Sequence, residues 1–600
     1  MSSAKRILLT TISASPRENV NYQFNNQVAI ASQAPVALIK LLPIHELPDK
    51  VIILCTQKLY DEQYETVRNL LLEYYDQILC NTLNQRPDVT EVRIPDGRTV
   101  EELWQILEAV LHSIPHNCEL TLDVTHGYRS FPFLYFTAAL FLKALRGVQI
   151  KAVYYAMLES EETEKPIIDL SLLLDMVEWF YATRIFHHTG QASPLCELLR
   201  PLETPPAGVT GKDNAPYQLV KSIRRALENV SAAYAQALPL ELGREAEQLL
   251  RRITQPIPRH MEQKVPLATE LFGSISSFAG SFALPATRQR RIRIKEVELN
   301  LSELTRQSSI IDSYLKQGYV NYALGMIREW MVSCAMWNQM AEESIYRVDW
   351  WIGHKRFETE HKFAVLARTA YKADGNTTRD IITPEQRWLA SKWQFFSDKR
   401  NQLAHHGFRY EYVLHSPQQI DEIRAQWEEL KSFVSSKPHW NLEIKRGQGT
   451  LLLSPLGLSK GLLFSALHHI RPDEVFVVTS EESAISIEEI TNRADWSGRK
   501  YVYKMKEPFT GFAEAKTISR ELQNYILKSD RIIANITGGT TAMQYVIQQV
   551  TQDLRLTGIE TEIIAIVDRR TPAEQVETPY VPGEIIYIEG QGRLNPPPND

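Results

Sequence analysis

The sequence predicts a protein of mixed class, in which two α/β regions with mainly parallel sheets flank an all-helical region. Three observations support this prediction. Short apolar runs alternate with helical stretches near the N-terminus, only helical patterns occur in the middle, and the alternation returns near the C-terminus. Strands that alternate with helices are typical of parallel sheets whose faces are both covered. A chain of 600 residues has room for three or four domains, and we expect the boundaries 1–170, 171–440 and 441–600.

The first region carries the clearest strand patterns. Its runs of branched and aliphatic residues are nearly continuous, as expected for parallel strands buried on both faces. The sequence predicts strands at Ile7–Ile12, Val51–Thr56, Glu119–Val124 and Gln149–Met157, and helices at Glu65–Ile78, at Val100–Ser113 and from Phe131 onward.

The middle region shows helical periodicity, for example over Ile310–Trp337 and Asp421–Val434. We expect a loop at Thr204–Gly211, where prolines and glycines gather, and a turn from Asp374. The last region again predicts strands and helices in alternation: strands at Thr450–Leu453, Glu474–Val478, Arg531–Ile536 and Glu562–Val567, and helices at Ser459–Ile470 and Thr541–Leu554. The proline-rich tail after Gly590 is expected to be disordered.

The composition excludes several classes of protein. The net charge of −6 provides no global basic field for gripping nucleic acid, so any RNA contact must come from local basic residues. The five cysteines are scattered and form no CxxC pair, which argues against a disulfide framework and a zinc site and favours a reducing cytoplasm. No signal peptide is recognised, and the longest apolar run, Phe131–Leu142, is too short to cross a membrane. The absence of phosphate-loop and dinucleotide fingerprints argues against NTP hydrolysis and redox chemistry, and we expect no cofactor and no metal site.

One polar motif stands out in the helical region: Arg400 and Asn401 are followed by His405, with His406 and Gly407 next. On a helix, Asn401 and His405 lie one turn apart on the same face, with Arg400 beside it. An arginine can hold a scissile phosphate, and a histidine can move a proton to or from a ribose oxygen. These side chains suffice for cleavage of RNA by its own 2′-hydroxyl. We expect Ser397 to cap the helix that carries the motif and Gly407 to end it.

Polar residues and glycines also gather where strands of both α/β regions end, which is where open parallel sheets bind ligands. In the first region the candidate ligand-binding residues are Thr10, Thr11, Ser13, Asp123, Thr125, His126, Gly127, Tyr128 and Arg129. In the last region they are Ser454, Gly457, Ser459, Lys460, Asn535, Thr537, Gly538, Gly539, Thr540 and Thr541. Backbone amides at such a turn before a helix bind anions, although the same residues are also common as simple helix caps.

The middle region resembles a HEPN domain, the helical ribonuclease fold with an R-x-x-x-x-H motif, on the strength of Arg400, Asn401 and His405. The resemblance implies a composite site built by two protomers and metal-independent cleavage that leaves a 2′,3′-cyclic phosphate. It assigns the phosphate and transition state to Arg400, positioning to Asn401, and proton transfer or positioning to His405. Arg328 and Glu329, on an earlier helical stretch, match polar positions of the family less specifically.

The stretch from Asp123 through Arg129 resembles a CARF domain, the Rossmann-like sensor fold of ancillary effectors in type III CRISPR systems. Arg129 then implies a phosphate contact, and His126 and Tyr128 imply contacts with adenine or ribose. The order of the two domains resembles effector ribonucleases that cyclic oligoadenylate activates allosterically to cut single-stranded RNA, and we expect cyclic tetra-adenylate to be the activator. The last region also resembles CARF, around Asn535 and Thr537, and we expect that it binds or degrades the activator.

Two alternatives remain open at this stage. The alternatives to an activated ribonuclease are a non-enzymatic nucleotide sensor that acts through a helical dimer and a HEPN toxin that ignores cyclic oligoadenylates. A homodimer or higher homo-oligomer follows from the resemblance alone, and no membrane partner is expected.

Overall fold

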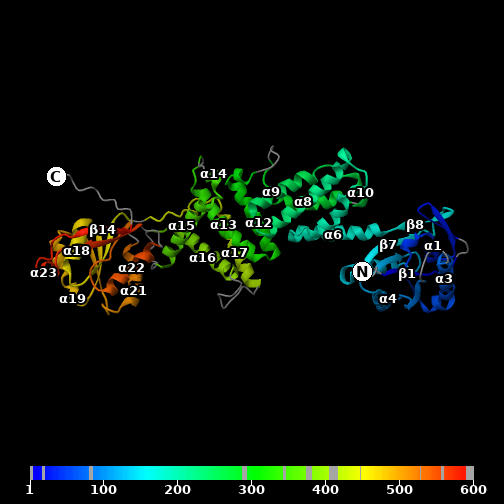
Figure 1. The fold of residues 1–600 in the computed structure, drawn as a ribbon, viewed down its shortest axis with the longest axis horizontal. Helices are drawn as coiled ribbons and strands as arrows, with labels where there is room; N and C mark the ends of the chain where they lie inside the picture. The colour runs from blue at the N-terminus through cyan, green and yellow to red at the C-terminus, as the bar shows by residue number, and fades with distance from the viewer. Residues whose placement is uncertain are drawn as a thin grey trace. The chain divides into compact units, whose positions relative to one another are not determined.

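The computed structural model describes residues 5–16, 20–79, 86–265, 267–286, 293–341, 343, 346–372, 381–404, 417–445, 447–526, 529–555 and 560–589. The chain divides into two compact units, one of Met1–Glu228 with Arg252–Ser277 and the other of Asn229–Arg251 with Phe278–Asp600. Figure 1 shows the order of the elements along the chain, with one sheet near each end and helices between them in sequence. The predicted turn from Asp374, as well as His405, Gly407 and the tail, lies outside the described residues.

The first unit contains an eight-stranded sheet whose order is β3-β2-β8-β7-β6-β1-β4-β5. Its five neighbouring strands from β7 to β5 are parallel, β8 is antiparallel to β7, and the β2–β3 hairpin extends the sheet beyond β8. The strands are β1 (Arg6–Thr11), β2 (Val20–Phe24), β3 (Gln27–Ala31), β4 (Lys50–Cys55), β5 (Asp88–Arg93), β6 (Glu119–Asp123), β7 (Gln149–Ala156) and β8 (Glu164–Asp169).

Helices cover both faces of this sheet because alternate residues of each central strand point to opposite sides. Leu8 and Ile53 pack beneath α1 (Ala34–Leu41) and α3 (Glu65–Leu79), within one buried cluster. Ile7 and Leu9 belong to the cluster on the other face, beneath α4 (Val100–Ser113) and α5 (Phe131–Arg146). The predicted strands and helices of this region are confirmed to within one residue at nearly every end, whereas β2, β3, β5 and β8 were not predicted.

The last part of the chain contains a six-stranded sheet with the order β11-β10-β9-β12-β13-β14. It matches the order β5-β4-β1-β6-β7-β8 strand for strand, with five parallel strands and an antiparallel sixth at the same edge. The predicted likeness of the two α/β regions therefore holds for their topology. The strands are β9 (Thr450–Leu456), β10 (Glu474–Thr479), β11 (Arg499–Lys504), β12 (Arg531–Asn535), β13 (Glu560–Val567) and β14 (Glu584–Glu589).

Helices again cover both faces of the second sheet. Alpha helices α18 (Lys460–Ile470) and α20 (Ile487–Arg493) pack on one face, and α21 (Ala515–Ile526) and α22 (Thr541–Arg555) pack on the other. Helix α22 follows β12 directly, as α5 follows β6 in the first sheet. In both sheets this strand-to-helix turn lies at the carboxyl edge, beside the end of the first strand.

Between the sheets the described residues are helical, as predicted. The helices are α6 (Ser171–Thr189), α7 (Ser193–Leu199), α8 (Ala215–Ala235), α9 (Pro239–Ile253), α10 (Arg259–Lys264), α11 (Ala268–Gly280), α12 (Leu301–Gln317), α13 (Val320–Gln339), α14 (Tyr346–Asp349), α15 (Gly353–Lys372), α16 (Pro384–Ala404) and α17 (Pro417–Ser432). Helix α13 packs against α12, α15 and α16, and its buried Trp330 contacts the rings of Trp427 and Trp440. No helix among the described residues is long and apolar enough to cross a membrane.

Two local predictions in this region are wrong. The helical pattern over Ile310–Trp337 is broken, because Gly318 adopts a φ of +80° and ends α12 before α13 begins. Ser397 does not cap a helix either, since it lies inside α16. The start of α16 is closed by Thr383 and Gln386, whose side chains each accept a hydrogen bond from the other's backbone N–H.

Candidate functional site

The carboxyl ends of β1, β6 and β7 are tied together by a network centred on Asp123, which is 2% exposed. One carboxylate oxygen accepts a hydrogen bond from the Thr10 hydroxyl at 2.7 Å. The other accepts from the backbone N–H and the hydroxyl of Thr125, at 3.1 and 2.6 Å. The Thr125 hydroxyl in turn accepts from the backbone N–H of Ala156 on β7 at 3.0 Å. The network brings together three of the predicted residues and fixes the turn that precedes α5.

A second group of predicted residues holds that turn against the start of α1. The Thr11 hydroxyl donates to the carbonyl of His126 at 2.5 Å, and Nε2 of His126 accepts from the backbone N–H of Ala34 at 3.3 Å. Burial lowers the pKa of His126, so its ring stays neutral and able to accept this bond. Ser13 exchanges two hydrogen bonds with the side-chain amide of Gln33, at 2.8 and 3.1 Å.

The exposed part of the turn has the chemistry of an anion site. Gly127 has a φ of +110°, and a Cβ there would lie 2.6 Å from the ring of Phe131, so the close turn depends on glycine. Tyr128 and Arg129 are exposed just before α5, and Ser130 at its N-cap makes no side-chain cap. At the start of α5 the backbone N–H of Phe131 donates to the carbonyl of Tyr128 and Pro132 has no N–H, so the exposed arginine and aromatic ring are the groups that suit a phosphate and a base.

The second sheet repeats the same network with different side chains. Asn535 is fully buried, and its amide donates to the hydroxyl of Ser454 at 3.0 Å. The carbonyl oxygen of its side chain accepts from the backbone N–H and the hydroxyl of Thr537, at 3.0 and 2.6 Å. The Thr537 hydroxyl accepts from the backbone N–H of Ile566 on β13 at 2.8 Å. Each bond has its counterpart in the first sheet, but a neutral amide replaces the carboxyl group of Asp123.

The turn after β12 is also built on glycine. Gly538 and Gly539 have φ values of +98° and +67°. A Cβ on Gly457 would lie 2.7 Å from the Cα of Gly539, so the loop after β9 approaches this turn at backbone distance. The Thr540 hydroxyl caps the start of α22, because it accepts a hydrogen bond from the backbone N–H of Met543. The same hydroxyl donates to the carbonyl of Pro508. Thr541 is the first residue of that helix and is exposed.

A pocket of about 290 Å³ opens at the same edge of the second sheet. Ser459 and Lys460 line it from the start of α18, and Asp568 lines it from the end of β13. The Lys460 ammonium forms an ion pair with Glu489 at 2.9 Å. The Arg570 guanidinium lowers the pKa of Asp568 through two hydrogen bonds. The predicted residues of this region therefore surround one edge of the sheet.

In the helical region, Arg400 donates a hydrogen bond to the side-chain oxygen of Asn401 at 3.1 Å, and both residues are half-buried on α16. Burial and the charge of Arg400 both lower the pKa of Arg328 of α13, so the two guanidinium groups lie within electrostatic range of one another. Arg328 also forms an ion pair with Glu360 of α15, and its guanidinium lies 5.1 Å from the ring centroid of Trp393. We call Arg328 and Arg400 the guanidinium pair.

Two guanidinium groups within electrostatic range of one another suit a site that receives a phosphate, and Glu360 and Glu329 balance part of the charge of Arg328. The sequence had pointed to Arg328 only weakly, because no spacing rule connects it with a residue 72 positions later (400 − 328). Glu360 was not predicted at all, and no sequence signal distinguishes it from an ordinary surface glutamate. Among the described residues no cluster of three or more His, Cys, Asp and Glu side chains has the geometry of a metal site.

Comparison with known protein families matches the residues of the first sheet to a known type of domain. Residues 7–159 match the family model described as the CARF domain of the CRISPR system endoribonuclease Csx1. A CRISPR-associated protein of Methanocaldococcus jannaschii is 27% identical over 108 residues, which make up 17% of this chain and 17% of that protein. The N-terminal α/β region thus contains a CARF domain of the Csx1 type. The match to the CRISPR-associated relative spans less than a fifth of this chain and less than a fifth of that protein.

A solved structure described as a type III CRISPR defence DNA nuclease activated by cyclic oligoadenylate aligns with 94% of this chain and 65% of that one. The identity is 12% and the TM-score is 0.17, which is too low to indicate a shared fold.

Proposed function

We propose that the chain is a metal-independent endoribonuclease of type III CRISPR defence, activated by cyclic oligoadenylate. The observation that carries the proposal is the occurrence, in one chain, of a CARF domain and of the guanidinium pair at the predicted Arg400 motif. A nucleotide sensor alone would not need two arginines gathered on helices outside the sensor domain.

The chemistry proposed for this site is transfer of a phosphoryl group within the RNA strand. The 2′-hydroxyl attacks the adjacent phosphorus, the bond from phosphorus to the 5′-oxygen breaks, and a 2′,3′-cyclic phosphate and a 5′-hydroxyl result. The 2′-hydroxyl loses a proton and the departing 5′-oxygen gains one, so no water is consumed. Arg400, oriented by Asn401, and Arg328 stabilise the charge of the phosphorane, and His405 moves a proton or positions the strand.

Activation is proposed to begin at the first sheet, where the ring phosphates bind the amides after Gly127 and the guanidinium of Arg129. A ring with two-fold symmetry suits a symmetric dimer, and two protomers would bring together two copies of Arg400 and His405. The ligand shifts the equilibrium only if it binds the active arrangement more tightly than the idle one. We propose cyclic tetra-adenylate as the activator to test first.

The second sheet supports a second role for the chain, which acts on the same class of ligand. Its network around Asn535 joins the same three strand ends as the network around Asp123 does in the first sheet, and its turn is built on two glycines that the loop after β9 approaches at backbone distance. We propose that it binds the activator and limits the response by degrading it. Purified protein with Asn535→Ala would then leave the ring intact and extend RNA cleavage, whereas unchanged ring decay would remove this role.

The deciding experiment incubates the purified full chain with labelled single-stranded RNA, EDTA and a panel of cyclic oligoadenylates, and follows RNA and rings over time. We expect cleavage that one ring stimulates, and its loss in both Arg400→Gln and His405→Ala. Lys399→Gln is the matched control, because it removes a neighbouring cation of α16 that pairs with Glu422 instead. Stimulated cleavage that survives both active-site changes would overturn the assignment.

The same experiment separates the two rival functions. A non-enzymatic sensor would bind a ring without cutting RNA, and a toxin-type ribonuclease would cut RNA equally well with and without every ring.

A further inference from the structure

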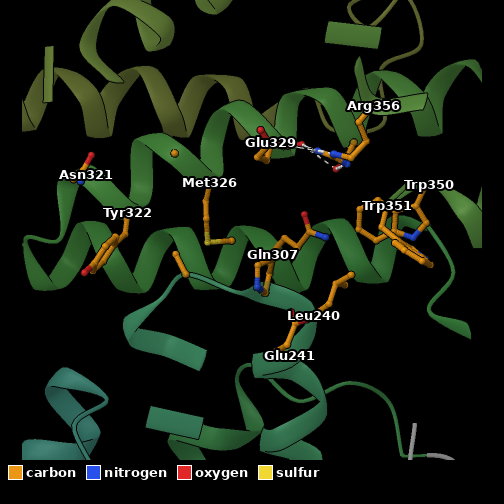
Figure 2. Close-up of a pocket in the computed structure, with 14 residues that line it drawn as sticks. Leu240, Glu241, Gln307, Asn321, Tyr322, Met326, Glu329, Trp350, Trp351 and Arg356 are labelled. Atoms are coloured by element: carbon orange, nitrogen blue, oxygen red, sulfur yellow. Dashed lines mark hydrogen bonds and ion pairs between the residues drawn. The ribbon is translucent and has the colours of Figure 1, made fainter. Parts of the chain in front are cut away.

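A pocket of about 390 Å³ lies beside α13 in the second compact unit. Tyr322, Met326, Glu329 and Ser333 line it from one face of that helix, at spacings of three and four residues that bring side chains into one stripe. Figure 2 shows Tyr322 at one end of the pocket and Trp351 with Arg356 near the other, with Met326 between them. Its volume falls within the range of about 300–1,000 Å³ that is usual for small-ligand sites.

The polar end of this pocket is built around Glu329. Arg356 of α15 donates to the carboxylate of Glu329 at 2.7 Å and to the hydroxyl of Ser333 at 3.0 Å. The carboxylate of Glu329 is still 57% exposed, so it can accept further hydrogen bonds. A fixed, half-exposed carboxylate at the end of an aromatic slot suits the amino group of a base.

The two tryptophans of the pocket differ in how their indole N–H groups are used. The N–H of Trp350 donates to the carbonyl of Val297 at 3.0 Å. The N–H of Trp351 is buried and has no acceptor within the described ranges of the chain. A buried donor without a partner is costly, so a small movement of the Trp351 ring that brings this N–H to a ligand oxygen or ring nitrogen would be favourable.

The polar end also lies next to the guanidinium pair. Glu360 follows Arg356 by one turn of α15, and it holds Arg328 as Glu329 holds Arg356. The guanidinium of Arg328 is itself 3.8 Å from the carboxylate of Glu329. These alternating charges connect the pocket to Arg328, whose other neighbour is Arg400.

We infer that this pocket receives a base of the RNA strand next to the scissile phosphate and so sets the sequence preference of cleavage. The inference rests on the proposed ribonuclease function. Tyr322 offers a ring to the base, while Glu329 and the N–H of Trp351 read the donors and acceptors of its edge. A pocket meant only for an apolar side chain would need neither the carboxylate nor the unpaired N–H.

The test is equilibrium binding of four fluorescent RNA homopolymers to the full chain, with and without cyclic tetra-adenylate. The 2′-oxygens carry methyl groups, so that the strands stay intact. We expect the wild type to prefer one base by about tenfold, which corresponds to about 1.4 kcal/mol. Trp351→Phe keeps the ring but removes the N–H, and Glu329→Gln removes the charge, so each should reduce the preference to less than about threefold.

Phe357→Ala is the matched control, because it removes an aromatic ring of α15 that is 68% exposed and does not line the pocket. Arg400→Gln should instead weaken all four homopolymers equally and lower the salt dependence of binding, since it acts on the phosphate. A base preference that both pocket variants retain would overturn the inference, as would pocket variants that alter only self-association in sedimentation. Intact base preference without RNA cleavage would remove the proposed activity but leave the pocket assigned to a base.

Discussion

The hydroxyl groups of Thr125 and Thr537 are predicted to stabilise the strand ends of the two sheets by similar free energies. Changing either threonine to valine keeps the shape of the side chain and removes one oxygen. In the second sheet that oxygen donates to Asn535 and accepts from the backbone N–H of Ile566. In the first sheet it donates to Asp123 and accepts from the backbone N–H of Ala156.

The expected cost follows from these bonds. Each valine removes two hydrogen bonds: losing the bond to Asp123 or Asn535 costs about 1 kcal/mol, and losing the other leaves a buried backbone N–H without a partner, which costs about 1–3 kcal/mol. We therefore expect each variant to lose at least about 2 kcal/mol, which corresponds to roughly 30-fold or more faster exchange of the amide hydrogens that the network protects.

The measurement is hydrogen exchange of the full chain followed by mass spectrometry of peptides. Thr537→Val should accelerate exchange in peptides that cover β13, and Thr125→Val should accelerate it in peptides that cover β7. Thr137→Val, which removes an exposed hydroxyl from α5, is the control and should change exchange by less than about threefold. Acceleration below that level in either variant would refute the view that these hydroxyls fasten the strand ends.

Three further outcomes are expected. Gly457→Ala and Gly539→Ala should each lower the unfolding temperature, because the new Cβ at 457 meets backbone at 2.7 Å and alanine at 539 has to adopt a left-handed φ of +67°; thermal scans check both, and an unchanged midpoint would contradict the close approach of the two loops. Arg400→Gln should abolish the proposed cleavage yet keep or raise the thermal midpoint, since it relieves the charge that lowers the pKa of Arg328; a lower midpoint would contradict this. Burial raises the pKa of the Cys334 thiol well above its usual value, so iodoacetamide should leave it unlabelled at pH 8 until urea is added, and labelling of the native protein would contradict the packing.

The central difference between the two networks is the charge of one side chain. Asp123 accepts three hydrogen bonds and donates none through its carboxylate, whereas Asn535 accepts two and donates two. The turn before α22 therefore lacks a buried carboxyl group that the turn before α5 has nearby. The same fold thus presents two different electrostatic environments to an anion, which is consistent with the two roles proposed for them.

The sequence alone determined the central strands and the alternation of classes along the chain. Strands such as Val51–Thr56 are buried on both faces, so their composition is apolar throughout and needs no partner to be recognised. Edge strands were missed for the converse reason. Residues Asp88–Arg93 are mostly polar and Glu584–Glu589 is a short run with a glutamate at each end, so only pairing with β4 and β13 makes them strands.

Two local predictions are wrong because the residue type at each position fits more than one backbone conformation. Gly318 was absorbed into a helical pattern because the apolar periodicity continues on both sides of it, although its left-handed conformation ends α12. Ser397 looked like a cap, but the capping pair of Thr383 and Gln386 lies far enough upstream that periodicity alone does not connect it with the Arg400 motif.

The residues of the candidate sites were named from the sequence, but their partnerships were decided by the tertiary structure. Nothing in the spacing shows that Thr10 meets Asp123, or that Arg328 lies near Arg400, since these contacts join segments that are distant along the chain. The sequence specified which side chains carry chemistry, because residue type fixes charge and hydrogen-bonding groups. Packing decided which of them share a site, because only the folded chain brings strand ends and helix faces within the few ångströms over which those groups interact.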